Sequence, residues 1–542
     1  MQKAILEIIK QKPKNREELT ELKRKVSRKY GIEILRNSEI LQVYNKLVKE
    51  KKLKPKPDLE AVLRKRSVRT ISGIAPVAVL TKPYKCPGKC AYCPEEKDVP
   101  KSYLSNEPAV MRAIRNDYHP YKQVQLRLRA LENNGHHPTK IELIVMGGTW
   151  SSFSEKYKYW YIKECFRATN DYKKKDKCDS KKISRVSLEK LKKDLAGEQK
   201  KNEKSGYKII GLTLETRPDY ITPKEVVQMR GLGATRVELG VQATSEEVLK
   251  INKRGHGVEE TVKATQILKD YGFKVTYHIM PGLPGSSYKK DLKMFKELFS
   301  DSRFQPDQIK FYPTVVTKGS LLYNWWQRGE YKPYTDKELQ NLIIDCKKAI
   351  PRYVRVIRLI RDIPGESIEA GNKITNLRQI MKDKGVKCEC IRCREAKEKK
   401  VKKDDLDLDF ITYSASGGEE KFISFQSRDG KTLYGFVRLR LPRENRNSLL
   451  ENKRVAFVRE LHIYGELVSV GENRKKIQHT GLGKRLMAEA EKITQEKGFE
   501  SLAVISGVGV RDYYRKLGYK LKNSYMVKKI DKFKCQNPNL PC

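Results

Sequence analysis

The sequence lacks long apolar runs and is short of acidic residues. It contains no stretch of 18 apolar residues and does not begin with an apolar leader, so we expect neither a membrane span nor a signal peptide. It contains 67 acidic residues and 114 lysines and arginines, which gives a formal net charge of +47 over 542 residues. A charged surface of the thermophile type would balance its signs. We therefore expect a polyanionic partner; nucleic acid is the first candidate, and a membrane surface is a poor second.

Cysteine is also sparse, and six of the 11 cysteines fall in two short motifs. Clustered thiols favour metal binding in a reducing cytoplasm over a disulfide framework. The first motif, Cys86, Cys90 and Cys93, has CxxxCxxC spacing and follows an apolar run that predicts a strand. Three such thiols can ligate three irons of a 4Fe–4S cluster and leave the fourth iron open. The alternatives are structural thiols or a zinc knuckle, although zinc needs a fourth ligand and the nearest histidine is His119.

The second motif, Cys388, Cys390 and Cys393, has CxCxxC spacing and precedes a charged run. We interpret it as a structural zinc site at a domain boundary, and a second Fe–S cluster or plain thiols stay open as alternatives. The fourth ligand is missing locally. The remaining cysteines are Cys165, Cys178, Cys346, Cys535 and Cys542.

The middle of the chain alternates short apolar strands with amphipathic helices, which predicts parallel βα units and a partial or full (β/α) barrel. Such barrels carry their chemistry at the C-terminal strand ends. Gly147, Gly148 and Glu215 fall at these ends, as does the first cysteine motif, and we predict that they bind cofactor. The predicted strands are Ala75–Thr81, Lys140–Met146, Ile209–Leu214, Arg236–Gly240, Val275–Met280 and Gln308–Tyr312.

The first cysteine motif on such a barrel resembles the radical S-adenosylmethionine (radical SAM) enzymes, in which the open iron binds S-adenosylmethionine. We expect four regions: residues 1–69, a basic helical module; 70–370, the barrel; 371–405, a cysteine-rich linker; and 406–542, a second α/β domain. We interpret the basic module as a nucleic-acid-binding domain, and a solvated charged face stays open as the alternative. The segment Tyr172–Lys208 is rich in charge and poor in apolar residues, and we interpret it as a long mobile insertion.

The C-terminal region contains the predicted strands Thr432–Leu441, Val455–Tyr464 and Ser501–Ser506. Between the last two lies Gln478–Lys484, a Q-x-x-G-x-G segment that opens a helix with one apolar face. Glycines at a helix start let backbone N–H groups approach a pyrophosphate. In this order the elements resemble the GNAT acetyltransferase fold, which binds acetyl-CoA; the alternative is a tight turn that caps an ordinary helix.

The two halves together resemble the catalytic-subunit family of the Elongator complex, in its archaeal stand-alone form. The resemblance extends roughly from Ser72 to Lys528. Eukaryotic members have a longer spacer between the first two cysteines, whereas this chain keeps the compact spacing. The motifs that carry the resemblance are Val145–Thr149, Glu215–Tyr220, Arg254–His256, Phe311–Thr314, Arg459–His462, Val504–Gly509 and Tyr513–Lys516.

This resemblance implies a radical SAM partial barrel plus a GNAT fold, and modification of the wobble uridine of tRNA at C5 with acetyl-CoA. Glu460 and His462, on one face of a predicted strand, are candidates for handling the water or the thioester, and Tyr513 for orienting the thiol. The anticodon stem-loop is the expected substrate; an electron-donor protein and accessory subunits are open questions. The implied acetyl-CoA contacts are Lys140, Glu460, Leu461, His462, Ile463, Gly481, Leu482, Gly483 and Tyr513.

The implied chemistry starts from homolytic cleavage of S-adenosylmethionine at the reduced cluster. The resulting radical takes a hydrogen atom from the acetyl methyl group, the carbon radical adds to uridine C5, and thioester hydrolysis leaves a carboxymethyl group. Two alternatives stay open. The GNAT half could acetylate protein lysines while the Fe–S cluster is structural, or the chain could be a non-catalytic tRNA-binding scaffold.

Overall fold

The computed structural model describes residues 1–64, 73–174, 186–361, 363–397, 406–450, 454–464 and 481–531. Within these ranges no helix has both the length and the apolar character needed to cross a membrane. The predicted roles of Gln478–Thr480, Cys178, Cys535 and Cys542 lie outside the described residues. The predicted domain boundaries are not tested and stay predictions.

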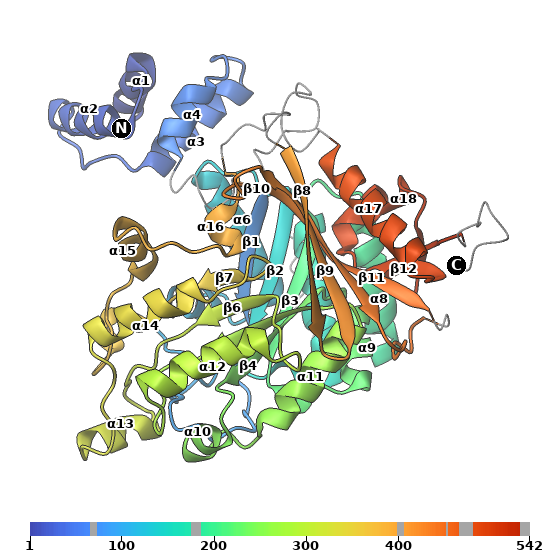
Figure 1. Cartoon of the computed structure of the whole chain (residues 1–542). Coiled ribbons are helices and arrows are strands. Elements are labelled where there is room, and N and C mark those ends of the chain that lie inside the picture. The colour runs from blue at the N-terminus through green and yellow to red at the C-terminus, as the bar shows by residue number, and fades with distance from the viewer. Residues whose placement is uncertain are drawn as a thin grey trace.

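The centre of the molecule is a parallel sheet in which each strand pairs with the next in the sequence. All six predicted barrel strands are present. A seventh strand was missed because its sequence, Arg-Val-Ile-Arg, is half charged and only Val356 is buried. The sheet curves without closing, which confirms a partial barrel (Figure 1). Its strands are β1 (Ile74–Leu80), β2 (Lys140–Met146), β3 (Lys208–Thr216), β4 (Arg236–Gln242), β5 (Lys274–Ile279), β6 (Gln308–Phe311) and β7 (Arg355–Arg358).

Helices between these strands cover the outer face of the sheet (Figure 1). They are amphipathic, and their apolar faces join the strands in one core. Two short helices, α15 (Leu377–Asp383) and α16 (Ile391–Arg394), follow the last strand. The outer helices are α5 (Pro108–Ile114), α6 (Pro120–Asn133), α7 (Glu155–Asn170), α8 (Leu188–Glu203), α9 (Pro223–Gly231), α10 (Glu246–Ile251), α11 (Val258–Asp270), α12 (Tyr288–Ser300), α13 (Leu321–Gln327) and α14 (Asp336–Lys348).

Helix α8 corrects the prediction of a mobile insertion for the described part of Tyr172–Lys208, while residues 175–185 lie outside the described residues. Its Leu191 and Leu195 are buried at i, i+4 spacing, and Asn202 bridges to Asn170 of α7 and Tyr207 ahead of β3. The five lysines of the helix itself are all exposed. Average composition therefore hid a narrow but sufficient apolar stripe.

A second, mixed sheet follows in the order β13-β14-β12-β11-β10-β9-β8. Only the central pair β11 and β12 is parallel among its described strands, and α17 packs over this part of the sheet. The three predicted strands are present, and together with the partial barrel this sheet confirms the expected fold class. The elements are β8 (Leu406–Ala415), β9 (Gly418–Ser427), β10 (Leu433–Pro442), β11 (Val455–Ile463), α17 (Leu482–Glu496), β12 (Ser501–Val504), α18 (Arg511–Arg515), β13 (Lys520–Lys522) and β14 (Tyr525–Lys529).

The N-terminal helices have an apolar core of their own, separate from the core that the two sheets share. They lie beside α6 (Figure 1), where Arg64 donates a hydrogen bond to the Gly135 carbonyl at 2.9 Å. The helices are α1 (Gln2–Gln11), α2 (Arg16–Lys29), α3 (Asn37–Lys49) and α4 (Pro57–Leu63).

A buried ion network joins the two sheets. Arg459 of β11 donates to Asp307, just before β6, at 2.8 Å and to Glu420 of β9 at 3.0 Å. Lys269 of α11 lies 3.6 Å from Glu420, and Arg438 of β10 lies 3.6 Å from Asp307. Burial alone would raise the pKa of Asp307, but the Arg459 guanidinium holds it below its usual range. The carboxylate is therefore charged, and each sheet supplies charges that the other neutralises.

Removal of one member should leave unpaired charge in this interface. We expect Asp307→Ala to destabilise the protein by about 3–5 kcal/mol, because Arg459 and Arg438 lose their buried partner. Glu444→Ala breaks an exposed pair with Arg446 and should cost about 1 kcal/mol or less. Thermal unfolding midpoints measure both, and equal midpoints for the two variants would contradict the role of the network.

Candidate active site

A single cavity of about 2350 Å³ extends through the inside of the partial barrel. The cysteine motif lines it at the C-terminal ends of the strands, and the second sheet lines it at their N-terminal ends. Because β2 spans Lys140 to Met146 at about 3.3 Å per residue, the two ends lie about 20 Å apart. From the second sheet, the α17 turn and α18 the lining residues include Glu460, Leu461, His462, Ile463, Gly481, Gly483 and Tyr513.

The cysteine loop is held in place by backbone hydrogen bonds. Ala91 donates to the Asn252 carbonyl at 3.0 Å and accepts from the Leu322 N–H at 2.8 Å. Cys90 is buried, whereas Cys86 and Cys93 are half-buried, and all three line the cavity. The Cys86 sulfur lies 3.8 Å from the Thr149 hydroxyl, just beyond β2.

Two arginines flank the Cys90 sulfur, and sequence reasoning missed this role. Arg254 Nη1 lies 3.3 Å from it and Arg217 Nη1 lies 4.0 Å from it. A hydrogen bond from Cys93 and the two guanidinium charges lower the pKa of Cys90 to about 4, against the effect of burial. Thiolate is the form that binds metal. Both arginines belong to motifs that carry the family resemblance, but nothing in their spacing places them beside Cys90.

The separation of the sulfurs distinguishes the two cysteine motifs. Those of Cys388, Cys390 and Cys393 all lie within 4.8 Å of one another, whereas those of the first motif do not. A tetrahedral zinc site with Zn–S of about 2.3 Å needs sulfurs about 3.8 Å apart. A cubane cluster places its thiolates on different irons and so needs a wider separation. The residues of the second motif therefore have the spacing that a single ion requires. The assignment of a multi-iron cluster to the first motif rests instead on its CxxxCxxC spacing and its place in the cavity lining.

The other predicted cofactor-binding residues lie next to the cysteine loop. Gly147 and Gly148 have positive φ angles of 127° and 91°, and a side chain on Gly147 would overlap Thr81. Gly148 lines the cavity, as does Glu215, which accepts a hydrogen bond from Tyr103 at 3.1 Å. This arrangement leaves backbone and one carboxylate facing the space beside the cysteines.

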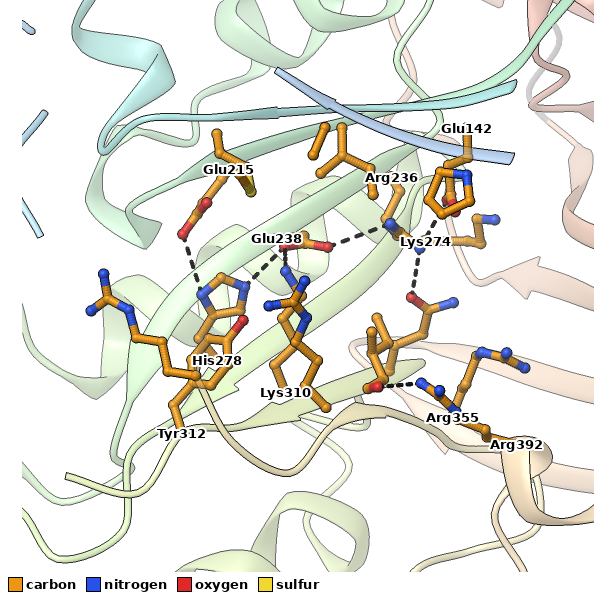
Figure 2. A pocket seen from close by; sticks show the side chains of 18 of the residues that line it. Glu142, Glu215, Arg236, Glu238, Lys274, His278, Lys310, Tyr312, Arg355 and Arg392 are labelled. Atoms are coloured by element: carbon orange, nitrogen blue, oxygen red, sulfur yellow. Dashed lines mark hydrogen bonds and ion pairs between the residues drawn. The ribbon is translucent and has the colours of Figure 1, made fainter. Parts of the chain in front are cut away.

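A buried chain of charged side chains crosses the middle of the cavity (Figure 2), and no local sequence pattern predicts it. His278 lies between two carboxylates, 3.0 Å from Glu238 and 3.4 Å from Glu215. Burial alone would raise the pKa of Glu238, but Lys310 beside it lowers that pKa well below its usual range. Glu238 is therefore charged, and it fixes one ring nitrogen of His278.

At the other end of the cavity, Glu460 and His462 lie on one face of β11, as i, i+2 spacing predicts. Glu460 is paired with Lys274 at 3.2 Å and Arg438 at 3.0 Å, and these cations lower its pKa to about 2 although burial opposes them. Burial lowers the pKa of His462 to about 3, so its ring is neutral at physiological pH. Its Nε2 atom has no hydrogen-bond partner among the described residues.

The predicted acyl-carrier segment opens α17. Gly481 is the N-cap with φ 80°, and nothing lies within 4 Å of the position that a side chain would take. The Tyr513 hydroxyl lies over the first turn, 2.8 Å from where a Gly483 side chain would begin. Leu482 is buried in the core and is absent from the cavity lining. Free backbone N–H groups in this open turn suit a pyrophosphate, which is what acetyl-CoA presents.

Comparisons with known proteins agree with this arrangement. Residues 81–298 match the radical SAM superfamily model, and residues 306–385 match the radical SAM C-terminal domain model. The tRNA uridine(34) acetyltransferase of Methanocaldococcus infernus is 45% identical over 91% of both chains, and that of Dehalococcoides mccartyi is 44% identical over 86% of this chain and 100% of its own. Human Elongator complex protein 3 is 37% identical, covering 95% of this chain and 93% of its own.

The chain belongs to this Elp3-type family of tRNA uridine(34) acetyltransferases. The solved structure of M. infernus Elp3 without residues 1–46 superposes with a TM-score of 0.71 at 41% identity, over 85% of this chain and 100% of that chain. The predicted family is therefore confirmed. The individual roles of the site residues stay predictions for this Elp3-type chain.

The packing of Gly88 against Arg217 provides a test of the cysteine site. A side chain at Gly88 would overlap the Arg217 guanidinium. We therefore expect Gly88→Ala to displace this guanidinium from Cys90 and to lower the free energy of unfolding by about 1–3 kcal/mol. Anaerobic reconstitution should then load less iron and sulfide per chain than in the wild type. Gly206→Ala, where nothing lies within 4 Å, is the matched control and should load normally. Equal loading in both variants would contradict the role of Arg217.

Proposed function

We propose that this chain modifies C5 of the wobble uridine of tRNA, using S-adenosylmethionine and acetyl-CoA. Its relatives carry the name tRNA uridine(34) acetyltransferase. The observation that supports the proposal most strongly is the shared cavity, because one space is lined by Cys86, Cys90 and Cys93 and also by Gly481, Gly483 and Tyr513. Lysine acetylation with a structural cluster gives no reason for such a connection.

Cys86, Cys90 and Cys93 hold the 4Fe–4S cluster in this proposal. Cluster and S-adenosylmethionine together supply an organic radical that can abstract hydrogen. Arg254 and Arg217 stabilise the thiolate charge, while Gly148 and Glu215 face the adjacent space, where the cofactor would lie. The protein contributes orientation and exclusion of water.

Acetyl-CoA binds at the opposite end, with its pyrophosphate at the Gly481–Gly483 turn. Burial raises the pKa of Tyr513, so its hydroxyl keeps its proton and can donate to the thiol end. The extended pantetheine arm then directs the acetyl group into the barrel, past Lys140 at the start of β2. This route brings the methyl group toward the radical source.

Glu460 and His462 have different roles in this scheme. Glu460 is held as an anion by two cations, and we assign it as a positioning residue for β11. Neutral His462, with its unpartnered Nε2 and its place in the cavity lining, is the group that contacts the thioester carbonyl or the hydrolytic water. It cannot act as a cationic acid near neutral pH, because its pKa is about 3.

Positive charge explains how RNA would be held. Four arginines line the cavity near β7, and Arg355 and Arg392 among them are labelled in Figure 2. The four are Arg355, Arg358, Arg378 and Arg392. Arginines of this kind bind phosphates, and a single-stranded anticodon loop can splay its base into such a space. The basic helices of residues 1–64 would add salt-sensitive backbone contacts. The predicted division into four regions belongs to this proposal.

We further propose structural zinc at Cys388, Cys390 and Cys393. Around this site Ile391 donates to the Val354 carbonyl at 2.9 Å and Arg394 donates to the Gly430 carbonyl at 3.2 Å. The loop therefore ties the edge of the barrel near β7 to the β9–β10 turn. A metal ion here would stabilise one wall of the cavity.

The decisive experiment is anaerobic incubation of the reconstituted protein with tRNA, S-adenosylmethionine, acetyl-CoA and dithionite. Nucleoside mass spectrometry should find a C5-modified uridine with the wild type, and none with Cys90→Ala. Cys346→Ala, which alters a buried cysteine outside the cavity lining, should retain activity. His462→Gln should still form 5′-deoxyadenosine but yield less modified uridine.

Two results would contradict the proposal. The first is an unmodified tRNA with fully loaded wild-type protein. The second is equal modification by Cys90→Ala, which would remove the radical step. Acetylation of a peptide lysine without S-adenosylmethionine or reductant would instead support the protein acetyltransferase alternative.

Metal analysis separates the two cysteine sites. Cys393→Ser should lose zinc but still bind iron, and its thermal midpoint should fall because a ligand of a structural ion is gone. Cys86→Ser is the matched control and should lose iron but keep zinc. If purified wild-type protein contains no zinc, or if Cys393→Ser retains it, the assignment is wrong.

A further inference from the structure

The cysteine loop has two faces, and only the inner one belongs to the cavity. Cys86, Gly88 and Cys90 line the cavity. Lys82, Tyr84 and Lys85 precede Cys86 on the same loop, and Lys89 lies between Gly88 and Cys90. All four are exposed and absent from the cavity lining. The side of the loop that faces away from the cavity is therefore basic.

The outer face has the composition of a docking surface. Three lysines and no acidic residue occur between positions 82 and 89, and no carboxylate among the described residues forms an ion pair with these lysines. Between them the Tyr84 ring is 47% exposed, yet it packs on Phe153 with ring centroids 4.6 Å apart, and Phe153 stacks on Tyr157 at 4.6 Å. A rigid aromatic group inside a charged rim is typical of protein interfaces.

We propose that this surface, Lys82, Tyr84, Lys85 and Lys89, docks a small acidic protein that carries one-electron equivalents on a flavin or an iron–sulfur centre. The partner is acidic because the rim is uniformly positive. It is a redox protein because the surface lies on the same loop as Cys86 and Cys90, which would hold the cluster. RNA is less suited, since its reactive base must enter the cavity, which this face does not line.

The electron balance is simple. One electron leaves the reduced carrier and reduces the oxidised 4Fe–4S cluster by one unit, with no bond made or broken in the protein. Because the donor and the RNA would use different faces, reduction does not require release of the substrate. This inference rests on the proposed radical chemistry, since only a redox-active cluster needs a carrier.

The experiment measures cluster reduction with no RNA or acetyl-CoA present, so it is independent of uridine modification. A triple variant, Lys82→Glu, Lys85→Glu and Lys89→Glu, is compared with wild type using a flavodoxin hydroquinone at low ionic strength. Absorbance and electron paramagnetic resonance monitor the reduction of the cluster. We expect the rate of reduction by flavodoxin to fall by roughly tenfold or more in the triple variant, because charge reversal removes the electrostatic steering of the acidic partner. Reduction by dithionite, which needs no docking, should be unchanged. Lys289→Glu, Lys293→Glu and Lys296→Glu on α12, also exposed, form the control.

A second measurement does not depend on cluster loading. Calorimetry of flavodoxin with protein that lacks the cluster but keeps its zinc should show binding that weakens with salt. The loop variant should lose this binding, and the α12 variant should retain it. Unchanged binding and unchanged reduction by flavodoxin in the loop variant would overturn the proposal. So would loss of anticodon stem-loop binding with normal reduction, which would make this surface an RNA contact. The milder Lys→Gln triple variant serves if the charge reversals impair folding.

Discussion

The buried network around Asp307, Arg459 and Glu420 is the interaction on which the rest of the structure depends. It fixes the N-terminal ends of β5 and β6 against three strands of the second sheet, with no exposed surface on these three side chains. A buried ion pair stabilises little on its own, since desolvation offsets most of its Coulomb energy. Its effect is specificity: the carboxylates accept from arginines at fixed positions, so one relative placement of the sheets satisfies every charge. An apolar interface would tolerate sliding.

That placement determines what the cavity can do. Most barrels of this kind use only the C-terminal ends of their strands. Here the cavity reaches both ends of the barrel strands. At their N-terminal ends it is bounded by the second sheet, through Glu460 and His462, and by the α17 turn. A group bound at the cysteine loop and a group bound at the α17 turn would therefore share one space inside the barrel. Neither site would have to move by the length of a strand for the two groups to meet. The charged chain through His278 makes this interior polar, which suits a nucleobase better than an apolar core would.

Local patterns predicted much of this arrangement and failed where contacts are distant. Strands β1 to β6, the cysteine spacing and the glycine turn follow from periodicity and backbone requirements within a few residues. Strand β7 was missed because Arg355 and Arg358 face a cavity rather than a core. Helix α8 was missed because lysines outnumber its buried leucines. Arg254 lies 164 residues from Cys90, and no local signal could reveal that the two side chains touch.

The two cysteine motifs show why geometry must decide what ligand counting cannot. Both offer three thiols within eight residues, and composition would assign them the same metal. In space one set converges within 4.8 Å and the other does not. The wider set also has two guanidinium groups beside Cys90, whereas Arg392 and Arg394 near the compact set donate instead to backbone carbonyls. Thiolates that share a cluster accumulate negative charge, and cations at van der Waals distance offset it. The compact set therefore has the spacing that one ion requires, and the two guanidinium groups beside Cys90 can offset the charge of thiolates that share a cluster.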